Sequence, residues 1–577
     1  MRIIARSILL AFSFSTLLAI GVLAQRNTPA VSQQSDSMDS PLLRQRARAH
    51  APETKSGIQG RSREPEQDDP RARMEWQRRD RGMPSVEFKE HVLNLRRERS
   101  AAQARADAPG SGSPTWVPIG PTGADYEQNE SFTGFVQDSG RARTILPDPA
   151  DANTVYFLTS GGGLWVTHNF TSTSTTWTPL TDSLPTTGGG SVVFGRTSNV
   201  LYLGLGDPFD LINSAGVMFK SVDGGTTWTN NVDLVNAMSV RDVKVDTSSS
   251  QDIVLVATDF GLFRSVDGGV SYAEVTGFGF QGQSAWSLVH SSAGWLLNAQ
   301  PCGILVPAVD CLTPATLYLS ADHGATWAPI SNAGNVYTGA GRTTLAVGAP
   351  GDSIVYAIAE NVNSNPILDD QRDLFRSTDG GQTWTALGLN SKIPTNPNSN
   401  NPNMDLLHGQ AYYNQMILVD SRDATRNTVY LGGNLSSAKS TDGGSTWTLL
   451  SNWLGGGTIN DPALGIGFGL PYAHADFHAA ALSTAGTPTL LFGNDGGLFI
   501  STDNGTTWSS DKNSGLQTFL IYSLASTPSF PSAVIFGAQD VGTACERATR
   551  PFTTRVGAAT ALGLDGVRRT PTLPLGL

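Results

Sequence analysis

The chain alternates short apolar runs with glycine-rich turns from about Trp116 onward. One stretch holds an apolar run opened by Gly-Arg (140–149), then TVYFLTS (154–160), GLWVT (163–167) and TWTPL (176–180). Runs of this length that are rich in β-branched and aromatic residues and bounded by turn residues predict β-strands. Because the same order of four short strands recurs further along, we expect an all-β fold built from repeated four-stranded units.

A shared motif marks the turn before the last strand of each unit. It has the form Ser-x-Asp-x-Gly-x-Thr-Trp, with Tyr272 closing one copy, and six copies align without gaps: 221–228, 265–272, 320–327, 377–384, 440–447 and 501–508. A degenerate seventh copy, THNFTSTSTTW (167–177), keeps Trp177 but lacks the Asp and both glycines. The closing aromatic residues lie 44 to 63 positions apart. Such a period predicts a β-propeller with one blade per repeat.

The two ends of this repeated body predict how the ring closes. WVPIG (116–120) matches the last strand of a unit but has no unit before it, whereas FLIYSLA (519–525) and AVIFGAQ (533–539) match the first two strands of another unit. An N-terminal strand that completes a C-terminal blade leaves no exposed edge. The sequence therefore predicts a propeller over 114–543, with seven Asp-box blades and a partial eighth blade closed by the N-terminal strand.

The flanking segments differ in character from the body. Residues 1–24 combine Arg2 and Arg6 with an apolar stretch and small residues before Gln25, which predicts a signal peptide, with an uncleaved membrane anchor as the alternative. Residues 25–113 are polar and predict a disordered linker or pro-segment. Residues 544–577 lack the blade pattern, so we expect an irregular tail, a truncation or frameshift scar. A signal peptide implies a secreted or cell-envelope protein, with no membrane contact after cleavage.

Charge and cysteine content narrow the possible partners. Residues 114–543 contain 15 basic and 35 acidic side chains, a net charge of −20, which argues against nucleic acid as a partner. The same charge disfavours anionic membranes and polyanionic glycans. Cys302 and Cys311 are nine positions apart in an interrupted repeat, and in an exported protein they are candidates for a loop disulfide. Cys545 is left over, and no zinc spacing is present.

The most regular acids of the chain are expected to have a structural role. In each motif the Asp accepts hydrogen bonds from turn N–H groups, the glycines take positive φ, and the aromatic residue packs under the turn. The acids concerned are Asp223, Asp267, Asp322, Asp379, Asp442 and Asp503.

The repeated motif resembles the bacterial neuraminidase repeat, or Asp box. This repeat occurs in sialidases, in xyloglucan-degrading endoglucanases, in the sortilin ectodomain and in exported bacterial proteins named glycosyl hydrolase by homology. Residues 114–543 look like that last group in segments such as GGGLWVT and GNDGGLFISTDNGTTW. The resemblance implies the propeller fold, whereas the activities of its members differ widely.

The resemblance to individual enzymes can be tested at particular residues. Sialidases share an Arg-Ile-Pro strand, and this tripeptide is absent here. The sequence therefore argues against sialidase activity. In xyloglucanases an early Thr-Asp-x-Gly-Gly-x-Tyr-Arg segment carries one catalytic Asp. The matching segment here, LTSGGGLWV (158–166), places Ser160 at that position. Because serine cannot replace a carboxyl group as acid or base at a glycosidic oxygen, the resemblance leaves any hydrolysis in doubt.

The remaining candidate site residues lie where the blades differ from one another. Alternation along a strand places the side chains of HADFH (474–478) on one face, so His474, Asp476 and His478 form either a metal set or a polar ladder at the channel. We favour the ladder, and we expect no metal and no cofactor. Asp207, Gln539 and Asp540 are candidates for ligand contact near the same mouth, and so are Trp453 and Tyr472, which flank a glycine-rich loop.

These observations predict a secreted Asp-box propeller that binds an extracellular ligand, most simply a carbohydrate, at the mouth of the channel. The alternatives are a sortilin-like module that binds a protein or peptide, and a structural component of the cell envelope. If the protein is an enzyme, the resemblance implies a glycoside hydrolase.

Overall fold

The computed structural model describes the propeller and the strands next to it. It describes residues 94, 98, 124–127, 135–209, 214–302, 311, 313–331, 338–362, 371–453, 469–527, 530–540, 542–547 and 550–555. The predicted signal peptide (1–24), nearly all of the predicted linker (25–113) and the strand WVPIG (116–120) lie outside these residues. Within the described part of the chain, no helix is both long and apolar enough to span a bilayer.

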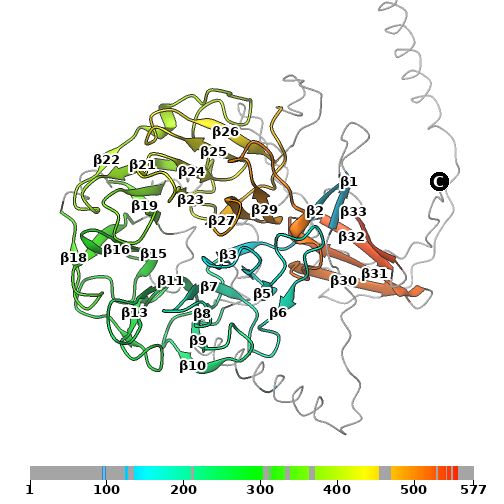
Figure 1. Cartoon of the computed structure of the whole chain (residues 1–577), viewed down its shortest axis with the longest axis horizontal. Helices are drawn as coiled ribbons and strands as arrows, with labels where there is room; N and C mark the ends of the chain where they lie inside the picture. Colours follow the sequence, from blue (N-terminus) through cyan, green and yellow to red (C-terminus); the bar gives the residue numbers. More distant parts are fainter. Residues whose placement is uncertain are drawn as a thin grey trace, which may run out of the picture. The chain divides into compact units, whose positions relative to one another are not determined.

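Seven antiparallel sheets form the blades of a propeller, as the repeats predict (Figure 1). The first four blades consist of β3 (Ala142–Pro147) to β6 (Thr178–Pro179), β7 (Gly189–Phe194) to β10 (Thr229–Asp233), β11 (Val240–Asp246) to β14 (Ala273–Glu274), and β15 (Ser284–Ser291) to β18 (Ala328–Pro329). The middle strands of these blades are β4 (Val155–Thr159), β5 (Gly163–Thr167), β8 (Leu201–Leu205), β9 (Val217–Ser221), β12 (Ile253–Thr258), β13 (Gly261–Ser265), β16 (Gly294–Gln300) and β17 (Thr316–Ser320).

The last three blades follow the same plan. They consist of β19 (Ala340–Ala346), β20 (Val355–Asn361), β21 (Gln371–Ser377) and β22 (Thr385–Ala386); β23 (Met416–Val419), β24 (Val429–Gly432), β25 (Ser436–Ser440) and β26 (Thr448–Asn452); and β27 (Phe477–Ser483), β28 (Thr489–Asn494) and β29 (Gly497–Ser501). Blade 7 completes its outer edge through an isolated bridge between Ile500 and Ser509. Two single-turn 3-10 helices, η3 (Leu389–Ser391) and η4 (Asp511–Asn513), lie in connections.

The ring closes by direct packing of the last blade on the first, not through a partial eighth blade. β27 packs beside β3, and Leu491 and Leu498 of blade 7 share a buried cluster with Ala142 and Phe157 of blade 1. A hydrogen bond of 2.7 Å from Ser139 N to Gly496 O joins the same two blades. The expectation of a partial eighth blade in the ring is therefore not confirmed, because seven sheets already meet edge to edge.

The strands expected for that partial blade belong to a separate six-stranded sheet. β30 (Ile521–Thr527) and β31 (Phe530–Ala538) continue through β32 (Gly542–Arg547) to β33 (Arg550–Arg555), which pairs with β1 (Ala124–Glu127), and β1 pairs with β2 (Phe135–Asp138). An N-terminal segment thus does meet C-terminal strands, although outside the ring. Regular strand structure also extends past Thr543, where we placed the end of the propeller. Residues 556–577 lie outside the described part.

The Asp-box turns are closed by their own side chains. In blade 6, Asp442 Oδ1 accepts hydrogen bonds of 2.9 Å from the backbone N–H groups of Ser445 and Thr446, and its Oδ2 accepts one of 2.6 Å from Thr446 Oγ1. Gly443 and Gly444 have φ values of 75° and 90°, which only glycine adopts readily. Trp447 is buried and donates to Gly444 O over 3.1 Å.

The degenerate seventh turn uses an asparagine in place of the Asp. Asn169 Oδ1 accepts from Thr167 Oγ1 over 2.9 Å and from Thr176 N over 2.9 Å, the same kinds of partner that Asp442 has. Trp177 then donates to Lys512 O of blade 7 over 2.7 Å. The turn of blade 1 therefore keeps the hydrogen bonds of the motif and also links the two blades at the closure.

The loop disulfide forms between Cys302 and Cys311, whose Cα atoms are 5.8 Å apart. It bridges an excursion between β16 and β17 of blade 4. Gln300 Nε2 reaches the carbonyl oxygen of Thr313 over 3.0 Å at the same place. The crosslink holds the two strand ends together next to Trp286, because Gln300 Oε1 accepts a hydrogen bond of 3.0 Å from Trp286 Nε1.

The box aspartates should make the stability of the propeller sensitive to acid. Slight burial raises the pKa of Asp267, but hydrogen bonds from Ser271 and Ser265 outweigh it and lower the pKa to about 2. A carboxyl group with a lowered pKa stabilises the fold above its unfolded pKa of about 4, and this contribution is lost as the pH falls through about 2. We expect thermal unfolding of wild type to shift downward between pH 4 and pH 2, and the shift to be smaller in Asp267→Asn.

The matched control is Asp233→Asn, which removes an exposed acid outside the boxes. Its acid dependence should follow that of wild type. An equal effect of the two substitutions would contradict the assignment of acid sensitivity to the box turns.

Candidate functional site

A repeated irregularity of the innermost strands turns one side chain of most blades toward the ring axis. The pairing of the first and second strands skips one residue near the start of β3, β7, β11, β15 and β27, and the skipped residues are Arg143, Gly190, Arg241, Trp286 and His478. In β19 the skip covers Gly341 and Arg342. A β-bulge of this kind re-aims a side chain. Side chains from blades 1, 3, 4, 5 and 7 therefore converge at the centre of the propeller.

Aromatic rings fill the centre of this convergence. Phe209, from the connection between β8 and β9, stacks on Trp286 with ring centroids 6.4 Å apart and meets Tyr413 edge-on at 5.1 Å. Phe209, Trp286, Tyr412 and Tyr413 form one buried cluster. The two tyrosines come from the segment that precedes β23. These rings give the channel an apolar centre to which the polar side chains are attached.

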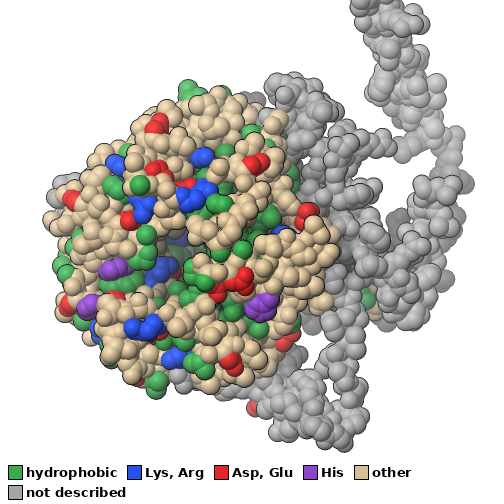
Figure 2. All heavy atoms as spheres, viewed as in Figure 1, with side chains coloured by type: hydrophobic (Ala, Val, Ile, Leu, Met, Phe, Trp, Pro, Cys, Tyr) green, Lys and Arg blue, Asp and Glu red, His purple; other side chains and the backbone are tan. Residues whose placement is uncertain are grey.

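Guanidinium groups surround these rings. The Cζ atom of Arg241 lies 3.4 Å from the Trp286 ring centroid, and those of Arg342 and Arg143 lie 4.9 and 5.2 Å from the Phe209 centroid. Burial lowers the pKa of Arg241 to about 9, with Asp259 opposing and Arg143 reinforcing the shift. Burial also lowers the pKa of Arg342 to about 9. Arginine side chains keep their charge in proteins at neutral pH. Figure 2 shows basic side chains within the hollow of the ring.

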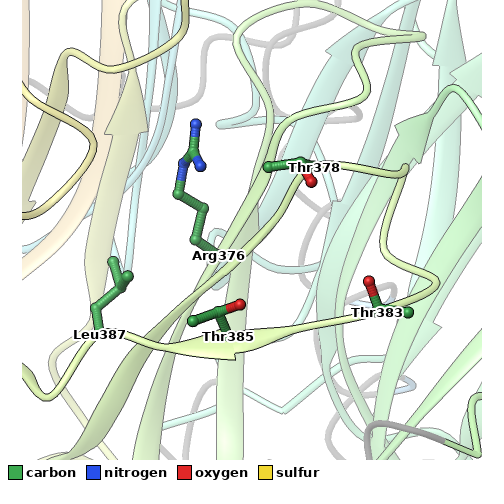
Figure 3. Close-up of a pocket in the computed structure, with 5 residues that line it drawn as sticks. All are labelled: Arg376, Thr378, Thr383, Thr385 and Leu387. Carbon is green, nitrogen blue, oxygen red and sulfur yellow. The ribbon is translucent and has the colours of Figure 1, made fainter.

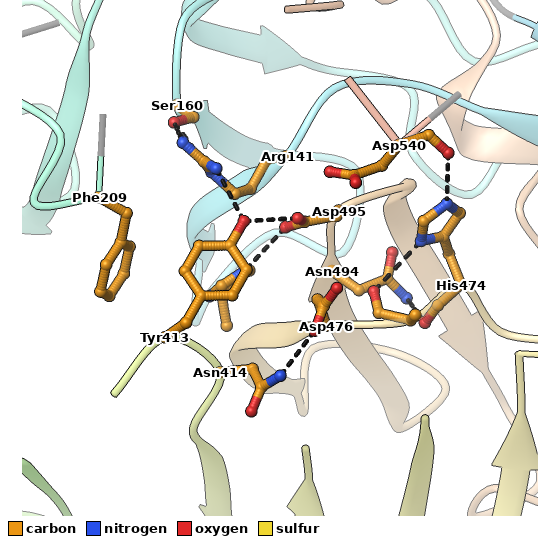
Figure 4. A network of polar contacts seen from close by, with 12 residues as sticks. Arg141, Ser160, Phe209, Tyr413, Asn414, His474, Asp476, Asn494, Asp495 and Asp540 are labelled. Carbon is orange, nitrogen blue, oxygen red and sulfur yellow. Dashed lines mark hydrogen bonds and ion pairs between the residues drawn. The ribbon is translucent and has the colours of Figure 1, made fainter. Parts of the chain in front are cut away.

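A second group of polar residues joins blades 1, 2 and 7 beside the arginines (Figure 4). Arg141 Nε donates to Ser160 Oγ over 3.0 Å, Arg141 Nη2 forms an ion pair of 3.2 Å with Asp207, and Ser160 Oγ also donates to Asp207. Asp207 Oδ1 further accepts from the backbone N–H of Phe209 over 2.6 Å. Ser160 therefore lies between a cation and an anion, fully buried.

Tyr413 links this group to blade 7. Arg141 Nη1 donates to its hydroxyl over 2.7 Å, and the hydroxyl donates to Asp495 Oδ2 over 2.5 Å. Asp495 Oδ1 lies 2.7 Å from Nε2 of His478. Burial and the charges of Arg141, Arg143 and Arg342 lower the pKa of His478 well below its usual value, so this imidazole is neutral. Its Nε2 must then carry the proton that Asp495 accepts, which leaves Nδ1 as a bare acceptor.

The segment HADFH does not present three side chains on one face. β27 begins only at Phe477, and Asp476 has a left-handed φ of 63°, so strand alternation does not extend back to His474. Asp476 accepts from Asn414 over 2.6 Å, whereas His474 Nε2 lies 3.2 Å from the backbone oxygen of Asp540. The alternative of a metal set is not supported, since no three His, Cys, Asp or Glu side chains of the described chain are grouped to hold a metal.

The other candidates lie around the same end of the propeller. Asn452, next to Trp453, forms a bridge with Tyr472, and the Tyr472 hydroxyl lies 3.4 Å from Asp138. Trp453 and Tyr472 are both partly exposed. Gln539 Nε2 donates to Asp540 over 2.8 Å. Most of the loop between Trp453 and Tyr472, residues 454–468, lies outside the described residues.

The order of strands places these candidates together and the Asp boxes elsewhere. In an antiparallel blade the start of the first strand and the end of the second lie at one end, which is shown by the pairing of Ala142 with Thr159 and of Gly189 with Leu205. Ser160 and Asp207 follow these strand ends, and Trp453 follows the end of β26. The box turns join the third and fourth strands at the opposite end. We call the end that carries Ser160, Asp207, Trp453, Tyr472 and His474 the candidate face.

A small pocket of about 130 Å³ lies at the box end of blade 5 (Figure 3). Its lining residues are Arg376, Thr378, Thr383, Thr385 and Leu387. Arg376 Nε donates to the Tyr356 hydroxyl over 3.0 Å. The guanidinium is therefore engaged in linking strands, and the pocket lies at the end opposite the candidate face.

Arg141, Arg143, Arg241, Arg342 and Phe209 were missed as site residues from the sequence. Arg143 and Arg241 occupy the position that the strand pairing skips in β3 and β11, and Arg342 belongs to the pair skipped in β19. Comparing the residue at this one position across all blades would have found three of the arginines. Phe209 carries no comparable signal, because it comes from a connection that differs between blades.

The contact between Ser160 and Asp207 predicts the effect of restoring an acid. Ser160→Asp would bury a second carboxyl group beside Asp207, and repulsion raises the pKa of one of the pair. A carboxyl group with a raised pKa destabilises the fold progressively as the pH rises from its unfolded pKa of about 4. We expect Ser160→Asp to lose stability from pH 4 to pH 7 in thermal unfolding relative to Ser160→Asn, which has similar size without the charge. A constant difference between the two variants at both pH values would contradict this assignment.

Comparisons with known proteins agree with this architecture. The family described as BNR/Asp-box repeat matches residues 375–386, the box of blade 5. A xyloglucanase from Hypocrea jecorina (strain QM6a) is 28% identical over 222 residues, which cover 36% of this chain and 23% of that protein. The match thus spans about a quarter of the length of this curated relative.

One solved structure shows a likeness of fold to this chain. The crystal structure of the GH74 xyloglucanase from Xanthomonas campestris has a TM-score of 0.51 at 19% identity, over 74% of this chain and 61% of that chain. The GH74 enzyme of Niastella koreensis has a TM-score of 0.38 at 16% identity, over 75% and 82% of the two chains. The chain therefore carries Asp-box repeats on a seven-bladed β-propeller and is similar, over part of its length, to a xyloglucanase.

Proposed function

We propose that this propeller binds an extracellular carbohydrate on its candidate face and does not hydrolyse it with its own residues. The proposed lack of hydrolysis rests on Ser160, its burial and its hydrogen-bond partners. The resemblance to xyloglucanases places a catalytic Asp at this position, whereas here a buried serine is held between Arg141 and Asp207. A hydroxyl in this setting cannot serve as the carboxyl acid or base that glycoside cleavage requires.

The carboxylates near Ser160 are engaged as acceptors. Asp207 accepts from Arg141, Ser160 and the backbone of Phe209. Asp495 accepts from Tyr413 and His478. Their oxygens are thus committed to hydrogen bonds that orient arginine, tyrosine and histidine side chains of the protein itself.

Aromatic side chains on the candidate face support carbohydrate as the ligand. Trp453 and Tyr472 are held at the two ends of one loop by the bridge from Asn452, and both keep exposed surface. Aromatic rings combine a flat apolar face with a polar edge, which suits the apolar face of a sugar ring. The similarity to a xyloglucanase supports a glucan backbone as the first ligand to test. We further expect the protein to be secreted or held in the cell envelope.

The test is binding of xyloglucan oligosaccharides to the purified full chain, measured by isothermal titration calorimetry together with an assay for reducing ends. We expect binding without release of reducing ends. Trp453→Ala and Tyr472→Ala should each weaken binding about tenfold, the equivalent of about 1.4 kcal/mol. Release of reducing ends by wild type would overturn the noncatalytic assignment, and absence of binding to xyloglucan and to other β-glucans would overturn carbohydrate as the ligand.

The matched control is Phe194→Ala, which removes a half-buried aromatic side chain at the end of β7, on the box side of blade 2. Its glucan affinity should equal that of wild type. Equal weakening in all three variants would indicate a general loss of folding and would contradict a site at Trp453 and Tyr472.

A further inference from the structure

Within the described residues, three arginines of the channel form no ion pair with an acidic side chain. Arg143, Arg241 and Arg342 form no ion pair within 4.0 Å in the described part of the chain. The Nε of Arg143 and the Nε and Nη1 of Arg241 are buried and have no hydrogen-bond partner there. Arginine is always charged at physiological pH, and a buried guanidinium with free donors is costly to the fold. Such groups call for an explanation in terms of a ligand.

The three guanidinium groups are close enough to act on one ligand. Arg241 and Arg342 both stack on Trp286, with Cζ atoms 3.4 and 5.3 Å from its centroid, and Arg143 and Arg342 both approach Phe209. The charges repel, since the charge of Arg143 contributes to lowering the pKa of both Arg241 and Arg342. An anion placed among them would relieve this repulsion and satisfy the free donors together.

The nearby acids are directed elsewhere. Asp259 Oδ1 accepts backbone N–H groups of Met238 and Ser239 over 2.8 and 2.9 Å, and Glu360 Oε2 accepts the backbone N–H of Arg342 over 2.9 Å. Arg342 Nη1 donates a hydrogen bond of 2.9 Å to the backbone oxygen of Tyr412. These acids offset part of the charge at a distance and leave the donor edges of Arg143 and Arg241 available.

We propose that Arg143, Arg241 and Arg342 form a binding site for the carboxylate group of a small molecule at the centre of the propeller. The aromatic rings cover the flat faces of the guanidinium groups and fix their orientation, so that the N–H edges are presented to a ligand. This arrangement suits the planar, bidentate geometry of a carboxylate. As whole residues Arg143 and Arg241 are half-buried, while their nitrogen atoms without partners are buried.

Two features favour a hydroxylated monoanion over a multiply charged ligand. The body of the protein has a net charge of −20 between residues 114 and 543, which disfavours the approach of a polyanion. The bare Nδ1 of His478 is buried without a partner in the described chain, and the imidazole lies 5.8 Å from the Phe209 ring centroid. A neutral acceptor near the arginines suits a ligand hydroxyl. A sugar acid such as glucuronate combines the two groups, and the site is independent of glucan binding at Trp453 and Tyr472.

The test uses the purified full chain and sodium glucuronate as the probe, with glucose as the uncharged control and inorganic phosphate as the competing oxyanion. In calorimetry and thermal unfolding we expect glucuronate to bind and to raise the melting temperature, and glucose to do neither. Arg241→Gln and Arg143→Gln should each weaken glucuronate binding at least about tenfold. Without ligand, both variants should be as stable as wild type or more stable, because each removes a buried cation that lacks a partner.

The control is Arg264→Gln, on β13 of the same blade as Arg241, whose Nε donates to the backbone oxygen of His323 outside the channel. It should bind glucuronate like wild type. Two outcomes would overturn the proposal: no binding of glucuronate by wild type, or tighter binding of phosphate than of glucuronate. A loss of unliganded stability in Arg241→Gln and Arg143→Gln would also overturn it, since it would assign these arginines to the fold alone. If the protein binds glucuronate but no glucan, this site is supported and the proposal of glucan binding at Trp453 and Tyr472 is refuted.

Discussion

The requirement that seven twisted sheets meet at one axis governs both the stability and the chemistry of this protein. Packed side by side around a ring, the sheets must bring their innermost strands together, and the volume there is small. A bulge near the start of most of these strands turns one side chain into that volume. Residues that are more than three hundred positions apart, such as Arg143 and His478, therefore share one environment.

The Asp-box turns make the ring possible and also explain why the fold could be predicted from sequence. Each turn is stabilised locally, through contacts within about eight residues, as in the hydrogen bonds of Asp442 to Ser445 and Thr446. A local interaction that repeats leaves a repeated motif in the sequence. Even the degenerate copy follows this rule, because Asn169 supplies the acceptor that an Asp supplies elsewhere. The seven Asp-box blades and their strand order followed from counting the copies.

The centre of the propeller could not be predicted in the same way. Its residues come from several blades and include arginine, glycine, tryptophan and histidine. Equivalent places without a shared chemical pattern are occupied by Arg143, Gly190, Arg241, Trp286 and His478. Strand alternation gave a wrong prediction at HADFH, where three side chains were expected on one face. The positive φ of Asp476 interrupts the extended backbone just before β27. Closure was misjudged for a related reason: whether a seventh or an eighth sheet completes a ring depends on packing angles, to which no single residue corresponds.

The arginines of the channel fall into two sets that differ in their contacts. Arg141 is committed to Ser160, Asp207 and Tyr413, and this commitment fixes the side chains at the edge of the candidate face. Arg143, two residues further along the chain and within β3, has its Nε buried with no partner in the described chain and lies near Phe209. A neutralised edge with exposed aromatic rings suits an uncharged sugar, whereas an unneutralised centre suits an anion. Because the pairing of β3 skips Arg143, two arginines that are two positions apart have opposite electrostatic roles.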